Sequence, residues 1–280
     1  MDARVSTRAP IDYLLHLADN ALVLGQRNAE WCGHAPILEE DMAMANNSLD
    51  LIGQARLLYQ YAAERLAGDV RAPRGAHWPA GPLTEDTLAY FRDVPEFRNY
   101  TLLELPHSPP LVPTGVGDRD WGVTIVRNFL YSALMVLVWE RLQRSADPQL
   151  AAIAAKSLKE VRYHLRHARD WLVRLGDGTD ASQRRAQAAL DWLLPFTDEF
   201  WTASGHEAQA RDNATGVDVA ALRADWDALV NDAIAEATLT RPAAVQGYIS
   251  QGKQGLHSEH LGYVLAEMQS LARAHPGATW

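Results

Sequence analysis

Cysteine is nearly absent from this sequence, which has only Cys32 among its 280 residues. A single cysteine excludes a disulfide within the chain and fits a reducing compartment, so we expect Cys32 to be a small, buried apolar residue. A secretory signal is also lacking, because the opening residues MDARVSTRAP have no apolar core. No apolar run approaches the length of a membrane span. These absences predict a cytoplasmic protein that does not cross a membrane.

Positive charge is in short supply, with 26 lysines and arginines against 35 aspartates and glutamates and a net charge of -9. This balance argues against nucleic acid or an anionic membrane as the main partner, but it leaves room for a small anion at a local basic patch. The sequence contains no glycine-rich phosphate loop and no Gly-x-Ser-x-Gly motif. Alternating strand patterns and repeats of about 20 to 50 residues are missing as well.

One long helical segment, residues 38–66, organises the rest of the chain. It contains no proline, and its apolar side chains recur at steps of three, four or seven: Leu38, Met42, Ala45, Leu49, Ile52, Tyr59, Ala63 and Leu66. That spacing keeps them on one stripe of a helix of about eight turns. Because an apolar stripe is stable only when another element covers it, the segment requires long helical partners.

The pattern predicts three such partners, at residues 11–31, 118–144 and 147–175. Shorter helices are expected near 84–90, 96–105, 182–202, 218–238 and 257–275, separated by polar segments at 204–216 and 241–255. The segments 68–82 and 107–117 are rich in proline, glycine or arginine and are expected to be loops. We therefore predict a single all-α domain over residues 1–280, a four-helix bundle with peripheral helices.

Four positions test whether this bundle carries a di-iron site. Such a site takes one Glu from each of two helices and a Glu-x-x-His pair from each of the other two. The corresponding windows hold Leu51 and Gln54 in one helix and Val161 and His164 in another, so only His164 matches a ligand type. Because iron in a helical cage prefers several carboxylates, we predict no metal, no cofactor and no catalytic residue in this chain.

Other polar clusters have competing interpretations. Glu160 and His164 can pair on one helix face, and His257, Ser258 and His260 can open a helix; we favour both over metal ligation. An autonomous di-metal oxygenase with an unusual ligand set of Glu160, His164 and His260 remains the alternative function, and a metal-free homo-oligomeric scaffold is a third.

Residues 91–100 place two arginines among three aromatic residues, an arrangement that can bind the phosphates of a nucleotide tail. Surface salt bridges with aromatic residues that anchor a loop are the simpler interpretation, and we favour it.

Several stretches, in order along nearly the whole chain, resemble the C subunit of bacterial phenylacetyl-CoA 1,2-epoxidase. They include EWCGHAP at 30–36, LDLIGQAR at 49–56, KEVRYH at 159–164, LGDGTD at 175–180 and GLHSEHLG at 255–262. The resemblance implies a ferritin-like bundle within a multicomponent complex for aerobic phenylacetate degradation. It also implies a related A subunit that holds the di-iron centre and pairs with this chain as a heterodimer.

In that family the C subunit is structural, and the complex has further subunits, including a reductase. The resemblance places Glu96, Phe97, Arg98 and Asn99 near the acyl-CoA. Segments 70–82 and 107–117 resemble insertions relative to shorter members.

Overall fold

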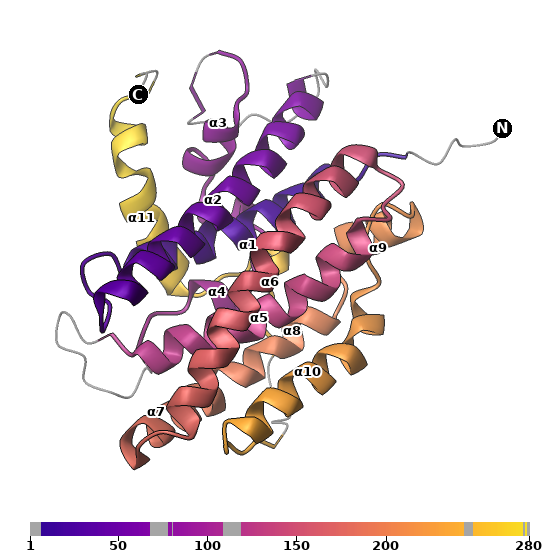
Figure 1. The fold of residues 1–280 in the computed structure, drawn as a ribbon. Helices are drawn as coiled ribbons and strands as arrows, with labels where there is room; N and C mark the ends of the chain where they lie inside the picture. Colours follow the sequence, from indigo (N-terminus) through magenta and orange to yellow (C-terminus); the bar gives the residue numbers. More distant parts are fainter. Residues whose placement is uncertain are drawn as a thin grey trace.

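Four long helices form the bundle in the computed structural model, which describes residues 7–67, 78–79, 81–108, 119–243, 249–276 and 278. They are α1 (Ile11–Ala29), α2 (Leu38–Ala67), α5 (Trp121–Leu142) and α6 (Pro148–Gly176). The chain pairs α1 with α2 and α5 with α6 (Figure 1). No strand occurs within the described ranges, so the predicted all-α, ferritin-like bundle is confirmed, and the four long helices begin and end within a few residues of the predicted positions.

Asp147 shows how the sequence starts the last of these helices. Its carboxylate accepts hydrogen bonds from the amides of Gln149 (3.1 Å) and Leu150 (3.3 Å), and Pro148 fills the first helical position. The same carboxylate also accepts from the Ala9 amide (2.8 Å) and the Tyr61 hydroxyl (2.7 Å). One side chain therefore joins the start of α6 to the chain ahead of α1 and to the end of α2.

Helix α5 is the core of the bundle. All of its residues are buried except Leu137, Glu140 and Arg141. The prediction that no apolar run approaches a membrane span is wrong here, because α5 is long and apolar enough to cross a membrane by length and composition. Nearly all of its apolar window is buried by the other helices, as in the core helix of a bundle.

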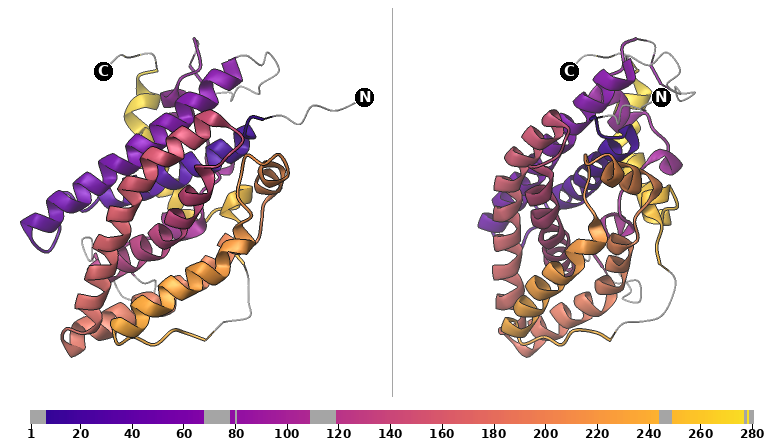
Figure 2. Two further views of the ribbon diagram at one scale, coloured as in Figure 1. Left: turned by 45° about the vertical axis from the view of Figure 1, so that its right-hand side comes forward. Right: turned by 90° about the vertical axis from the view of Figure 1, so that its right-hand side faces the viewer.

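Seven shorter helices surround the bundle in the described part of the chain. They are α3 (Glu85–Tyr90), α4 (Thr101–Glu104), α7 (Asp180–Leu193), α8 (Asp198–Trp201), α9 (Gly205–Asp212), α10 (Arg223–Glu236) and α11 (Glu259–Ala274). Short 3-10 turns lie at Val94–Glu96, Leu194–Thr197, Val219–Leu222 and Gly252–Gln254. Helix α10 packs on α5 and α6, whereas α11 packs on α1 and α3 at the other side of the molecule (Figure 2).

Two local expectations are wrong. Cys32 is exposed, because it lies in the turn between α1 and α2 rather than in the core. The polar segment 204–216 contains α9, which begins with a capping box: Ser204 accepts from the Glu207 amide while the Glu207 side chain accepts from the Ser204 amide. The Ser-x-x-Glu spacing was the signal for this helix.

Helix α2 buries a different face from the predicted one. Its inner side presents Met44, Ser48, Leu51, Ala55 and Leu58 to the bundle. Helix α1 approaches this side closely at Gly25, where an added Cβ would lie 3.2 Å from Ile52 Cγ1 and 3.3 Å from Leu51 Cβ.

The first half of the predicted stripe points away from the bundle. Leu38 is 73% exposed, Met42 60%, Leu49 66% and Ile52 37%. Only the second half, including Tyr59 and Ala63, is covered within the chain.

Candidate functional site

The four positions at which the sequence was tested for a di-iron site lie on two neighbouring helices. Leu51 and Gln54 on α2 and Val161 and His164 on α6 are all buried. Helices α2 and α6 pack side by side in one layer of the bundle (Figures 1 and 2). The structure therefore brings the four positions together on two packed helices, with two aliphatic side chains among them.

The two polar members are hydrogen-bonded to the opposite helix. The Gln54 side-chain amide donates to Glu160 Oε2 at 3.0 Å, and His164 Nε2 donates to Asp50 Oδ2 at 3.0 Å. A third bond joins His167 Nε2 to Glu40 Oε2 at 2.8 Å. We call these three cross-links the α2–α6 seam. The expected Glu160–His164 pair is not what forms, because each of the two side chains bonds across to α2 instead.

These residues fit a di-iron centre poorly. Leu51 and Val161 supply no donor atom, and the nitrogens of Gln54 and His164 bind protein carboxylates. Within the described ranges, no three His, Cys, Asp or Glu side chains are grouped so as to hold a metal ion, and the alternative set of Glu160, His164 and His260 is not such a group. His260 lies instead in the first turn of α11, which Ser258 caps as expected.

Residues 96–99, which the resemblance places near the acyl-CoA, mostly make contacts within the chain. Phe97 and Asn99 are fully buried. The Arg98 guanidinium donates to the carbonyls of Pro95 (2.7 Å) and Phe97 (2.8 Å), and Glu96 accepts from the Asp93 amide at 2.7 Å. Only Glu96 and Arg98 keep part of their surface exposed.

Arg92, the other arginine of this region, forms a buried ion pair rather than a surface one. Its guanidinium bonds both oxygens of Asp19, which is fully buried on α1, and stands over the Phe97 ring at 4.3 Å. Asp19 also accepts from the Tyr59 hydroxyl and from the Arg98 amide at 2.7 Å. This arginine is therefore unavailable to a nucleotide phosphate, while the expected anchoring by an aromatic residue is present.

A second buried carboxylate, Glu104, was not predicted from the sequence. It accepts from His257 Nδ1 at 2.8 Å and from the Asn99 side chain at 2.9 Å, while His257 Nε2 lies 3.0 Å from the Phe97 carbonyl. Burial opposes protonation of His257, but the hydrogen bond to Glu104 and its charge outweigh burial and raise the pKa of His257. No local motif marks this pair, since 153 residues separate its members.

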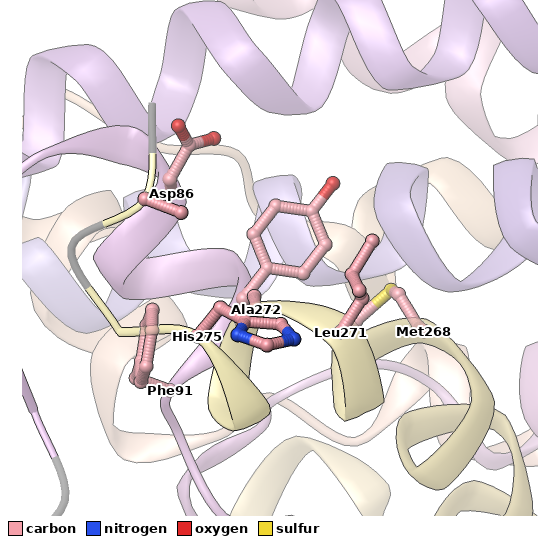
Figure 3. A pocket seen from close by; sticks show the side chains of 8 residues that line it. Asp86, Phe91, Met268, Leu271, Ala272 and His275 are labelled. Atoms are coloured by element: carbon pink, nitrogen blue, oxygen red, sulfur yellow. The ribbon is translucent and has the colours of Figure 1, made fainter. Parts of the chain in front are cut away.

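A pocket of about 460 Å³ lies between α3 and α11 (Figure 3). Tyr90, Phe91, Met268 and Leu271 line it, with Asp86 and His275 among the polar lining residues. Partial burial and the charge of Glu85 raise the pKa of Asp86. None of the predicted site residues lines this pocket.

An unusual surface lies on α2. Leu38, Met42, Ala45, Leu49, Ile52 and Gly53 form what we call the outer strip, where the large side chains are 37 to 73% exposed and Ala45 and Gly53 are half-buried. Contiguous exposed apolar residues of this kind mark interaction surfaces more often than isolated ones do. Sequence periodicity identified the apolar members of this strip and predicted that partner helices cover them, but in the described part of the chain the large ones are exposed.

Comparison with known proteins gives two consistent matches. The family model described as phenylacetic acid catabolic protein matches residues 2–280. The chain is also 46% identical over 268 residues to the C subunit of 1,2-phenylacetyl-CoA epoxidase from Escherichia coli (strain K12). That alignment covers 96% of this chain and 98% of the Escherichia coli protein.

Proposed function

The chain belongs to the phenylacetic acid catabolic protein family, and from this premise we propose that it is the structural, non-catalytic subunit of a phenylacetyl-CoA 1,2-epoxidase. In this proposal it pairs with a di-iron A subunit in the cytoplasm, within a complex that includes a reductase. The observation that carries the proposal is the α2–α6 seam. Where bundle oxygenases place Glu-x-x-His ligands, this chain has Leu51 and Val161, and Gln54 and His164 are bonded to protein carboxylates.

The seam suits a supporting role. Its hydrogen bonds hold α2 and α6 in fixed register, and a rigid pair of helices can position the surface that a partner needs. The oxygen chemistry belongs to the iron of the A subunit, and this chain contributes through the geometry that it imposes on that subunit.

Contact with the acyl-CoA remains part of the proposal, assigned to residues 96–99. Glu96 and Arg98 are the members with exposed surface, whereas Phe97 and Asn99 act by positioning the segment.

Iron content is the first test. The chain is purified alone and after co-expression with the A subunit, and iron is measured by elemental analysis after gel filtration. We expect iron only in the complex. Stoichiometric iron in the isolated chain would overturn the proposal in favour of the autonomous oxygenase.

The substitution Gln54→Ala tests the same point by activity. We expect epoxidation by the assembled complex to stay within a few-fold of wild type, because Gln54 acts only in the seam. A loss of turnover in a fully assembled complex would contradict the structural role.

A further inference from the structure

We propose that the outer strip of α2 is the surface on which a helix of the A subunit docks. This inference rests on the proposed function and goes further, because it names the face that meets the partner. It starts from the spacing of the strip: Leu38, Met42, Ala45, Leu49 and Ile52 follow one another at steps of four, three, four and three. That 3-4 spacing is typical of the contact line between two packed helices. In the described part of the chain the large side chains of the strip stay 37 to 73% exposed, with Ile52 at its margin beside Gly25 of α1.

Gly53 provides a second, independent indication. It lies inside a 30-residue helix, where glycine is unfavourable relative to alanine. Gly25 has a reason within the chain, because α2 crosses it closely, but a Cβ added to Gly53 would meet no atom within 4 Å. A glycine at the end of the exposed strip, near the middle of α2, allows the backbone of another helix to approach there.

The size of the strip shows how far the interface extends. From Leu38 to Ile52 it runs about 21 Å at the usual helical rise, and at roughly 10 Å wide it offers about 200 Å² against the roughly 800 Å² per partner of a stable interface. The partner must therefore also cover α6, the neighbour of α2 in the same layer (Figure 2). There, Tyr163 is 42% exposed and stacks on His167, whose imidazole bonds Glu40 of α2.

The positive charge on α6 indicates which side chains the partner should carry. Lys156, Lys159 and Tyr163 fall on one helix face at steps of three and four, and both lysines are exposed. Neither forms an ion pair with a described residue. The partner that fits this face is a helix with an apolar stripe opposite α2 and carboxylates on the edge toward α6.

The main test measures binding of the full chain to the A subunit. Leu49→Asp should raise the Kd by about 30-fold or more, because it buries a charge in an apolar interface, while the Tm of the free chain stays near wild type. The matched control is Leu271→Asp on α11, where the native leucine is 56% exposed. We expect this control to leave the Kd within about twofold, as a surface change outside the interface should.

A second pair of variants separates docking from folding. Gly53→Ala should raise the Tm by about 1–4 °C because alanine favours a helix, yet weaken binding by about tenfold because its methyl group obstructs the approaching helix. Gly262→Ala on α11, where an added Cβ also meets no atom within 4 Å, should raise the Tm without changing the Kd.

The outcomes distinguish a failure of the proposed function from a failure of the proposed docking face. If the wild-type chain does not bind the A subunit, the proposed function itself fails. If the wild-type chain binds and Leu49→Asp and Gly53→Ala bind equally well, the function stands and the docking face is overturned. Loss of binding in Leu271→Asp alone would move the interface to α11. If Leu49→Asp abolished self-association but not binding to the A subunit, a second copy of this chain would be the occupant.

Discussion

The inner side of α1 and the outer strip of α2 reverse the usual places of polar and apolar side chains. On α1, charged Asp19 is fully buried, whereas on α2 Leu49 is 66% exposed. The two cases differ in where their partners are. Asp19 is satisfied within the chain by Arg92, Tyr59 and the Arg98 amide, but Leu49 has no cover among the described residues. Folding satisfies the first region, and in our proposal the A subunit covers the second.

The largest effect should come from breaking the polar region. Asp19→Ala leaves the Arg92 charge buried without its partner, so we expect the free energy of unfolding to fall by about 3–5 kcal/mol. Urea unfolding followed by circular dichroism measures this change. Asp12→Ala, at an exposed position in the first turn of the same helix, should cost about 0.5 kcal/mol. Equal losses in the two variants would show that the buried pair is not special.

A smaller effect should follow from removing His257. His257→Gln loses a hydrogen bond to a charged group, and we expect a cost of about 1.5–3 kcal/mol at acidic pH. Because the folded pKa of His257 is raised, its contribution is full below the unfolded pKa and disappears as pH rises through the folded pKa. The stability difference between wild type and variant should therefore shrink as the pH is raised from mildly acidic to mildly alkaline.

Other histidines change the stability with pH in the opposite direction. The measurement therefore compares wild type with His257→Gln, so that their contributions cancel. Burial lowers the pKa of His107 to about 4, and burial together with His16 lowers that of His206 to about 3. Their contribution is present above the unfolded pKa and is lost as the pH falls. A difference that grew with pH would contradict the assignment to His257.

The smallest effect should come from the apolar region. Leu49→Ala should change the unfolding free energy of the isolated chain by less than about 0.5 kcal/mol, because the side chain packs against little. Leu51→Ala, two residues along the same helix but 2% exposed, should cost about 2–5 kcal/mol. Thermal unfolding of both variants would sharpen the comparison, and a large loss at Leu49 would show that the strip is covered within the chain.

The sequence predicted the bundle well because the apolar spacing of α1, α5 and α6 reports directly on burial. It failed on α2 for a physical reason: periodicity places Leu38, Met42 and Leu49 on one stripe, but it does not show whether the rest of the chain covers that stripe, and in the structure these side chains are 60 to 73% exposed. The sequence also missed Asp19 and Glu104, because ion pairs between residues 73 and 153 positions apart leave no local pattern. Spacing selected the four positions tested for a metal site, which stay a prediction, whereas the cross-helix bonds of Gln54 and His164 required the structure.

The contacts of Asp147 affect the order in which the helices become connected as the chain is synthesised. Its carboxylate is shared among the start of α6, the Ala9 amide and the Tyr61 hydroxyl, which lie 138 and 86 residues earlier. During synthesis, α1 and α2 leave the ribosome long before Asp147 does, so the early hairpin lacks this connection until the second pair of helices arrives. Closing such distant contacts is slow. The start of the last long helix therefore stabilises the first two. A truncated chain that stops before Asp147 leaves the N-terminal hairpin without these hydrogen bonds.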